Sequence, residues 1–289
     1  MEVGDLLGLE HTLEDVRRAE VSAPGYLSPS RLSKIKSYRS IWISDLHLGT
    51  HRFQAVALLD FLSRHVAENL FLVGDIIDGW NQGPTWYWSD AQEAVAAELR
   101  RWSREGTRVE LIPGNHDISA ELAERLLGLR TGEPEMLYRT GEGRKMLVIH
   151  GHQFDRSLAG GRWWQGGQAY AVAMRINDWY RRDPDEPGSQ ARALSRFLRY
   201  RLRRAVQYFT DFDDRAIVEA VRDRKADGII CGHIHRAEQR LLGPVWYIND
   251  GDWVESCTAL VEGWDGALRL LRWDPFESGA EAGLVGVAS

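Results

Sequence analysis

The sequence has little of the features that mark secreted or membrane-spanning proteins. Its 289 residues include only two cysteines, too few for a disulfide framework, and we interpret Cys231 and Cys257 as buried free thiols in strand-like segments. It has no run of about 18 apolar residues, which excludes a spanning helix. The N-terminus has neither a basic start nor an apolar core of signal-peptide length, so we expect a cytoplasmic protein.

The composition that remains is sufficient for a folded core. Apolar residues make up 44% of the chain, which at this length can fill one large α/β domain or one domain with an insertion. The formal net charge of −6 disfavours indiscriminate binding to nucleic acid. We therefore expect a globular protein.

From Ser40 onward, apolar strand-like segments alternate with helical segments. The elements expected first are strands at 40–44, 70–74, 108–112 and 145–149 and helices at 54–67, 89–105 and 118–128. After Asp155 the pattern becomes helical, at about 166–182 and 190–224. Strand character then returns at 227–231, 244–248, 256–261 and 267–273. These last strands predict antiparallel pairing that completes a second sheet.

The same patterns divide the chain into a core and three other parts. We expect the core to comprise residues 39–155 and 225–275, interrupted by a helical insertion over 156–224. Residues 1–38 mix charge with Ser, Pro and Gly and are expected to form a loosely ordered extension. The tail 276–289, rich in Gly and Ala, is expected to be flexible.

Five apolar runs end on polar motifs that carry potential metal ligands. The motifs are Asp45-Leu46-His47, Gly74-Asp75, Gly114-Asn115-His116-Asp117, His150-Gly151-His152 and Gly232-His233-Ile234-His235. Sheets covered on both faces bind ligands beyond the carboxyl ends of their strands, so these motifs should meet. Imidazole, carboxylate and amide oxygen without thiolate suit Mn, Fe, Zn or Co. The set exceeds what one ion would take, which implies two ions that share Asp75.

Together the five motifs resemble those of the calcineurin-like metallophosphoesterases. The resemblance covers about residues 40–275 and implies an α/β protein, a four-layer α/β/β/α sandwich with a helical cap insertion. It implies two divalent ions, with Mn the favoured metal. One ion would be bound by Asp45, His47, Asp75 and His235, and the other by Asp75, Asn115, His150 and His233. His116 would stand beside the leaving group without binding an ion, and Asp117 would orient it.

Such a centre would hydrolyse a phosphodiester or a pyrophosphate. Two divalent ions activate water and neutralise charge on the phosphoryl group, so no side-chain nucleophile is needed. His116 could protonate the departing oxygen, or it could be a structural histidine. His152 could orient His150, contact substrate or be structural. Asp78 could contact substrate or cap its loop, and Asp155 is expected to cap the helical region that follows.

Tryptophans and arginines gather near these motifs. Trp80, Trp86 and Trp88 follow the Asp75 motif, and Trp163, Trp164 and Trp179 follow the His150 motif. They form either a small core or an apolar groove that binds substrate. For the groove, our candidates are Trp80, Trp163 and Trp164. Residues 190–210 contain six arginines and no acid. This basic amphipathic helix would be a solvated face, a phosphate clamp that includes Arg196, Arg199 and Arg203, or a contact with anionic lipid.

A closer resemblance is to the bacterial UDP-2,3-diacylglucosamine diphosphatases of lipid A biosynthesis. It is carried by residues 75–80, by the helical region after His150, and by residues 231–235 together with 249–255. It implies an acylated nucleotide-sugar pyrophosphate as substrate and peripheral contact with the inner face of the cytoplasmic membrane. The corresponding motifs of those enzymes are similar to G-N-R-D and H-G-D, with Arg and Asp where this chain has His116 and His152. A paralogue that acts on another phosphodiester or pyrophosphate is therefore an alternative. Further alternatives are a nuclease, and a metal-stabilised protein that binds lipid or nucleic acid without turnover.

Overall fold

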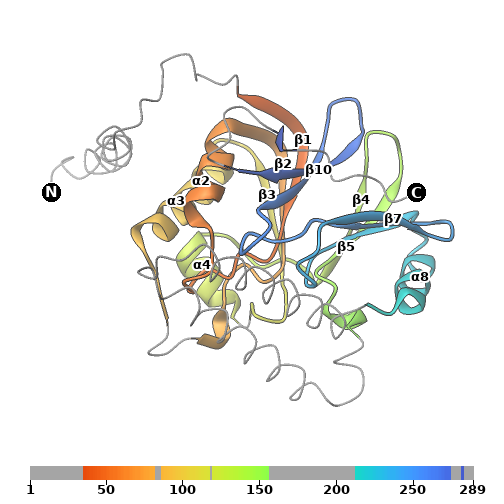
Figure 1. Ribbon diagram of the computed structural model, residues 1–289, viewed down its shortest axis with the longest axis horizontal. Helices are drawn as coiled ribbons and strands as arrows, with labels where there is room; N and C mark the ends of the chain where they lie inside the picture. The colour runs from red at the N-terminus through yellow and green to blue at the C-terminus, as the bar shows by residue number, and fades with distance from the viewer. Residues whose placement is uncertain (1–34, 82–85, 118, 156–211, 275–280, 283–289) are drawn as a thin grey trace, which may run out of the picture. The chain divides into compact units, whose positions relative to one another are not determined.

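Two β-sheets pack face to face in this protein, whose computed structural model describes residues 35–81, 86–117, 119–155, 212–274 and 281–282 (Figure 1). The first sheet has the spatial order β11 (Glu281–Ala282), β10 (Leu268–Trp273), β9 (Thr258–Glu262), β1 (Lys36–Ile43), β2 (His65–Val73) and β3 (Arg108–Ile112). The second has the order β4 (Glu135–Arg139), β5 (Lys145–Ile149), β6 (Gly228–Cys231), β8 (Val245–Asn249) and β7 (Glu238–Leu242). Strands β1 to β3 run parallel in the first sheet, as do β5, β6 and β8 in the second. The ends of these parallel strands set the place of the functional loops.

Helices cover the outer faces of both sheets. The helices α2 (Ala55–Arg64), α3 (Asp90–Arg104) and α4 (Ala120–Leu127) lie on the first sheet, and α8 (Asp214–Asp223) lies on the second (Figure 1). Short 3₁₀ turns follow β2 and β5, namely η2 (Gly79–Asn81) and η3 (His152–Phe154). Ser89, Ser119 and Asp213 cap the helices α3, α4 and α8 by accepting hydrogen bonds from backbone N–H groups.

Strand β2 shows why four layers form. Leu70 and Leu72 pack with the helices α2 and α3, whereas Phe71 and Val73 pack in the apolar layer between the sheets. Side chains alternate between the two faces of a strand, so a continuous apolar run is buried on both faces. The predicted α/β/β/α sandwich is therefore confirmed.

Some boundaries differ from the sequence prediction. The helix expected over 54–67 ends at Arg64, and β2 begins at His65 because residues 65–67 pair with residues 36–38 of β1. Strand β1 therefore begins inside the expected extension, whose residues 1–34 lie outside the described part of the chain. Pairing between distant segments decided this boundary against local helix propensity.

The C-terminal strands also join differently. We expected the last strands to complete the second sheet, but β9 pairs antiparallel with β1, and β10 pairs with β9, in the first sheet. Within the expected tail, Glu281 and Ala282 pair with β10. Strands β4 and β7 were not expected, and both are edge strands of the second sheet.

Helix α8 belongs to the layers of the sandwich rather than to the insertion expected over 156–224. Its Ile217 and Val221 are buried against Ile229 of β6 and Tyr247 of β8. Residues 156–211, the remainder of that insertion, lie outside the described part of the chain.

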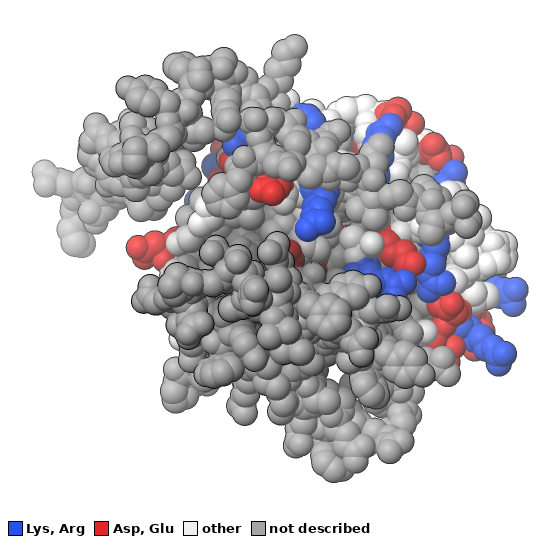
Figure 2. Space-filling model, viewed as in Figure 1, with Lys and Arg blue, Asp and Glu red and all other residues white. Residues whose placement is uncertain are grey.

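The described surface shows mixed charge. On the face drawn in Figure 2, Lys and Arg side chains are interspersed with Asp and Glu. Ion pairs among the described residues include Arg224 with Glu135 at 2.6 Å and Arg240 with Asp214 at 2.8 Å. None of the helices described has the length and apolar character required to cross a bilayer.

Candidate metal centre

The predicted ligands lie in loops that follow the parallel strands of both sheets. In the first sheet, β1 is followed by Asp45 and His47, β2 by Asp75 and β3 by Asn115. In the second sheet, β5 is followed by His150, and β6 by His233 and His235. Three groups bring ligand atoms within 4.8 Å of one another: Asp45 with His47 and His235, His47 with Asp75 and His116, and Asp75 with His150 and His233. Loops far apart in sequence therefore converge on one centre.

Asp75 lies in the middle of this centre. Its Oδ2 is 3.3 Å from Nε2 of His150, 3.8 Å from Nε2 of His47 and 3.9 Å from Nε2 of His116. Its Oδ1 accepts a hydrogen bond of 2.8 Å from the backbone N–H of His116. One carboxylate oxygen thus faces histidines from both sheets, as a ligand shared by two ions requires.

Hydrogen bonds orient several of these side chains. Nδ1 of His150 donates to the carbonyl of Val73 at 2.9 Å, which leaves Nε2 to face Asp75. Oδ2 of Asp45 accepts the backbone N–H of His233 at 2.9 Å, and Oδ1 lies 3.2 Å from Nε2 of His235. Each side chain therefore presents a defined atom to the centre.

Four of these atoms are buried and have no hydrogen-bond partner among the described residues. They are Asp45 Oδ1, His47 Nε2, Asn115 Oδ1 and His150 Nε2. Buried polar atoms without partners are costly and rare, so four at one place indicate a ligand that the chain itself does not supply. Carboxylate, amide oxygen and imidazole nitrogen are a donor set that fits divalent cations.

The backbone of the centre is strained. Asp45, His47, Asp75, His233 and His235 all have positive φ, from 50 to 73°. Only two other non-glycine residues in the described chain share this conformation. Such strain persists only where the surrounding structure imposes it, and it clusters at functional sites.

Two glycines allow the loops to approach each other. A Cβ atom on Gly74, whose φ is +82°, would lie 2.3 Å from the ring of His150. A Cβ on Gly232 would lie 2.3 Å from Oγ of Ser44 and 2.5 Å from Oδ2 of Asp45. A larger residue at either position would displace a predicted ligand.

The carboxylates and imidazoles shift one another's pKa. Burial opposes ionisation of Asp45, but His235 lowers the pKa of Asp45 to about 2. Burial likewise opposes charge on the histidines, yet Asp75 raises the pKa of His150 to about 10 and Asp45 raises that of His235 to about 9. The carboxylates thus create a negative centre that holds protons or metal ions.

His116 is oriented by Asp78 and not, as expected, by Asp117. Nδ1 of His116 lies 3.2 Å from Oδ1 of Asp78. The carboxylate of Asp117 instead accepts the backbone N–H groups of Gly114 and Ile77 at 2.9 and 2.8 Å, together with that of Ile76. Sequence adjacency misled the prediction because the chain turns between His116 and Asp117.

Trp80 stacks on His116. The ring centroids are 4.1 Å apart with an interplanar angle of 24°, and Trp80 is 59% exposed. Trp86 and Trp88 instead stack on each other and pack against the core of the first sheet. The predicted substrate contacts Trp163, Trp164, Arg196, Arg199 and Arg203 lie outside the described residues.

His152 and Asp155 lie beside the second group of ligands. The ring of His152 is 5.7 Å from that of His150, and its buried Nδ1 has no hydrogen-bond partner among the residues that the structure describes. Burial and the charge of His150 lower the pKa of His152 to about 4, so this ring is neutral at pH 7. Asp155, expected only as a helix cap, contacts Nε2 of His233 at 3.0 Å.

Sequence reasoning missed the polar residues that join these loops from behind. The amide of Asn249 donates to the carbonyl of Gly232 at 2.6 Å, and Ser44 lies between Asp45 and Asp250. Residues 249–255 were noted only as part of a family resemblance. The available signal was an Asn-Asp pair at the end of an apolar strand, the same pattern that marks the ligand motifs.

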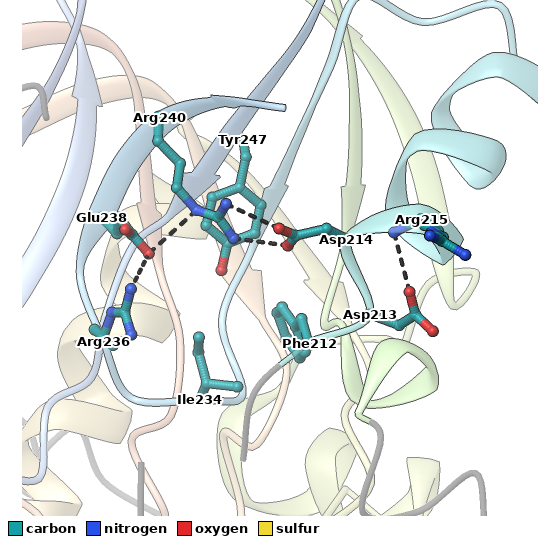
Figure 3. A pocket seen from close by; sticks show the side chains of 9 residues that line it. All are labelled: Phe212, Asp213, Asp214, Arg215, Ile234, Arg236, Glu238, Arg240 and Tyr247. Carbon is teal, nitrogen blue, oxygen red and sulfur yellow. Dashed lines mark hydrogen bonds and ion pairs between the residues drawn. The ribbon is translucent and has the colours of Figure 1, made fainter. Parts of the chain in front are cut away.

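A separate pocket lies next to residues 233–235 and has a volume of about 690 Å³ (Figure 3). It is lined by Phe212, Asp213, Asp214, Arg215, Ile234, Arg236, Glu238, Arg240 and Tyr247. Figure 3 shows Arg240 between Asp214 and Glu238, with its guanidinium 4.7 Å from the centroid of the Tyr247 ring. Arginines and acids are balanced in this lining, so it does not favour a ligand of either charge.

Comparisons with known proteins agree with this geometry. The family model described as calcineurin-like phosphoesterase matches residues 38–237. Relatives named UDP-2,3-diacylglucosamine hydrolase include that of Ectopseudomonas mendocina, 28% identical over 75% of this chain and 91% of the relative. That of Chromohalobacter salexigens is 28% identical over 74% of this chain and 88% of the relative. Similar solved structures include Yfce, a phosphoesterase from E. coli, with 16% identity, a TM-score of 0.42, and coverage of 86% of this chain and 96% of that one.

Proposed function

Because this chain belongs to the calcineurin-like phosphoesterase family, we propose that it uses two divalent metal ions to hydrolyse a phosphodiester or pyrophosphate bond. One observation carries the proposal. Four buried ligand atoms without hydrogen-bond partners converge around Asp75, on loops from both sheets. As the described side chains lie, none of the four atoms has a hydrogen-bond partner, whereas divalent cations would satisfy them.

The ligand groups support the assignment of residues to two ions. Asp45, His47, Asp75 and His235 would hold one, and Asp75, Asn115, His150 and His233 the other. Asp155 contacts Nε2 of His233, so Nδ1 is the ring nitrogen left for an ion. Mn is our favoured metal, and Fe, Zn or Co also fit this donor set. When bound, such ions activate water and neutralise charge on the phosphoryl oxygens.

His116 is placed to act on the leaving group. Burial disfavours its charged form, but the hydrogen bond to Asp78 and the charge of Asp75 raise the pKa of His116 above its usual value. A protonated Nε2 can donate to the departing oxygen, a contribution that is typically about 10²–10⁴-fold. Trp80 shields one face of the ring and thereby limits contact with water.

The substrate we propose is a pyrophosphate of the UDP-2,3-diacylglucosamine type, or another lipid-linked or nucleotide-linked phosphoester. The names of the relatives support it, and so does the position of the insertion. Asp155 and Phe212, the described residues on either side of 156–211, form a β-bridge. Asp155 contacts His233, and the ring of Phe212 is parallel to that of His233 at 6.0 Å. We propose that the insertion is a helical cap whose Trp163, Trp164 and arginines contact substrate, with peripheral attachment to the inner face of the cytoplasmic membrane.

The test is hydrolysis of bis-p-nitrophenyl phosphate by the purified protein with added Mn²⁺. Asp75→Asn should abolish hydrolysis while circular dichroism and thermal unfolding still show a folded protein, because the amide cannot bridge two cations. Asp90→Asn, at an exposed position in the first turn of α3, is the matched control and should retain full activity. Full activity in Asp75→Asn would refute the shared ligand.

A substrate panel separates the remaining alternatives. Degradation of single-stranded DNA without cleavage of any nucleotide-sugar lipid would favour a nuclease. Stoichiometric binding of two metal ions without turnover of any phosphoester would favour a metal-stabilised binding protein.

A further inference from the structure

A buried hydroxyl group joins a predicted metal ligand to a second carboxyl group behind it. Oγ of Ser44 lies 2.6 Å from Oδ2 of Asp45 and 2.6 Å from Oδ1 of Asp250. The carbonyl of Gly251 is farther away, at 3.1 Å. Ser44, Asp45 and Asp250 are each at most 1% exposed, so the three groups are shielded from bulk solvent.

The two contacts of the Ser44 hydroxyl group require one proton more than two ionised carboxylates and a serine provide. A serine hydroxyl donates one hydrogen bond and can accept others, whereas an ionised carboxylate only accepts. Both contacts are as short as charge-assisted O–H···O hydrogen bonds. If Asp45 and Asp250 were both ionised, one of the two contacts would be between bare oxygen lone pairs. One carboxyl group must therefore carry a proton.

The surroundings of the two carboxyl groups decide which one carries it. Asp45 has partners for a negative charge, since Oδ2 accepts the N–H of His233 and Oδ1 lies 3.2 Å from His235. In the described chain, Asp250 has no cationic side chain within ion-pair distance, and its buried Oδ2 lacks a hydrogen-bond partner. Burial is the largest influence on the pKa of Asp250 and, with the charge of Asp45, raises it well above its usual value.

We propose that Asp250 is protonated at neutral pH and donates to Oγ of Ser44, so that the Ser44 hydroxyl donates to Oδ2 of Asp45. This chain of two hydrogen bonds would fix the Asp45 carboxylate with Oδ1 directed at the ion. Asp250 is then a positioning residue that acts through Ser44. The effect on metal binding rests on the function proposed above, whereas the protonation of Asp250 does not.

The residues at the end of β8 would in this way position two of the loops that carry candidate metal ligands. Asn249 fixes the loop that carries His233 through the carbonyl of Gly232, and its neighbour Asp250 fixes the loop that carries Asp45 through Ser44. A neutral Asp250 also avoids burying a third carboxylate charge beside Asp45 and Asp75.

Metal affinity provides the first test. In Asp250→Asn the amide NH₂ can donate to Ser44 as the neutral acid does, so the Mn²⁺ affinity measured by isothermal titration calorimetry should stay close to that of the parent. Asp250→Ala and Ser44→Ala break the chain and should weaken Mn²⁺ binding on the order of 10-fold or more, the usual effect of removing a group that orients a ligand. Equal losses in Asp250→Asn and Asp250→Ala would overturn the proposal, because they would mean that the charge of Asp250 is needed.

Infrared difference spectroscopy provides the second test and depends on neither metal nor turnover. The parent minus Asp250→Asn spectrum at pH 7 should contain the C=O stretching band of a protonated carboxyl group. A carboxylate band in its place would overturn the proposal. If the protonated band is present but no phosphoester is hydrolysed, the protonation of Asp250 stands and the proposed function fails. This measurement also decides the question if Asp250→Ala does not fold.

Discussion

Asp78 and Asp117 show how similar residues in neighbouring loops differ in role. Asp78 contacts Nδ1 of His116 and lies 3.8 Å from Nδ1 of His47, whereas Asp117 binds only backbone N–H groups of its own and the adjacent loop. Asp78 therefore favours the protonated form of His116, and Asp117 stabilises the conformation of the loops.

We expect Asp78→Asn to change the pH dependence of hydrolysis. Without the Asp78 charge, the pKa of His116 falls, so the protonated form is lost at a lower pH. The alkaline limb of the kcat profile for bis-p-nitrophenyl phosphate should therefore move to lower pH, with kcat reduced on the order of 10-fold at pH 8. The measurement is a pH series of kcat at saturating Mn²⁺.

Asp117→Asn is the matched comparison. It should lower the free energy of unfolding by about 2 kcal/mol, because the amide has one acceptor oxygen where the carboxylate has two, so a backbone N–H group loses its partner. The pH at the midpoint of the alkaline limb should stay unchanged. A shift of that limb in Asp117→Asn but not in Asp78→Asn would restore the role for Asp117 that its sequence position suggested.

At the scale of elements, Tyr138 joins the two sheets. Its hydroxyl on β4 donates to Glu262 of β9 at 2.5 Å and lies 2.6 Å from Oγ of Ser40 on β1. Burial and the hydrogen bond to Glu262 raise the pKa of Tyr138 to about 12. A folded-state pKa above that of the unfolded chain stabilises the protein fully below the unfolded value, near 10, and this stabilisation is lost as the pH rises towards 12.

Tyr138→Phe should therefore matter below pH 10 and much less at high pH. We expect it to lower the free energy of unfolding by about 1 kcal/mol at pH 8, and we expect the difference from the parent to shrink between pH 10 and 12. Urea unfolding across this range measures it. Tyr87→Phe, at a position that is 38% exposed, is the control and should show a constant, small difference. A parent-to-variant difference for Tyr138→Phe that grows with pH would contradict the assigned sign.

Some strands could be predicted from the sequence, and others could not. Strands such as β2 were predictable because a long apolar run between turn signals has few alternatives. The partners of β9 and β10 were not, since antiparallel strands can complete either sheet and only packing decides. Edge strands β4 and β7 were missed because each exposes apolar residues, Leu137 and Leu241, and lacks a continuous buried run.

In the candidate site, the ligand motifs could likewise be predicted from the sequence, whereas the contacts that orient them could not. The proximity of candidate ligands such as Asp45 and His235 was predictable because each lies in a short motif directly after a strand. The contact of Ser44 with Asp250 joins residues 206 positions apart, and that of Asp78 with His116 joins residues 38 apart. A single sequence carries no signal for such pairs, so the roles of the orienting residues required the structure.

At the scale of the whole molecule, the centre connects the two halves of the sandwich. Asp75 comes from the first sheet and His150 from the second, and their facing atoms are 3.3 Å apart. Ions shared by such residues would hold the sheets together at this edge. Tyr138 joins the sheets at a different place, through its contacts with Ser40 and Glu262, so the candidate metal centre would be a second junction between them.

The insertion begins and ends at this junction, which leads to the last prediction. Arg196, Arg199 and Arg203 belong to residues 156–211. The residues that flank this segment, Asp155 and Phe212, both lie beside His233. If the cap binds the remote part of a large substrate, that binding energy is used to position the phosphoryl group at the metals. Replacing Arg199 and Arg203 together by Ala should then reduce kcat/KM for UDP-2,3-diacylglucosamine on the order of 10-fold or more, as expected for lost charge-assisted hydrogen bonds.

The small substrate and a distant arginine provide the controls. Bis-p-nitrophenyl phosphate has no remote part to bind, so its kcat/KM should change little in the same double variant. Arg222→Ala removes an exposed arginine from the last turn of α8 and should leave both substrates unaffected, which separates a local contact from a change in net charge. Equal losses on the large and the small substrate would mean that the arginines support the fold of the insertion and do not bind phosphate. In that case the reason to prefer a lipid-linked pyrophosphate over a smaller phosphodiester would rest on the relatives alone.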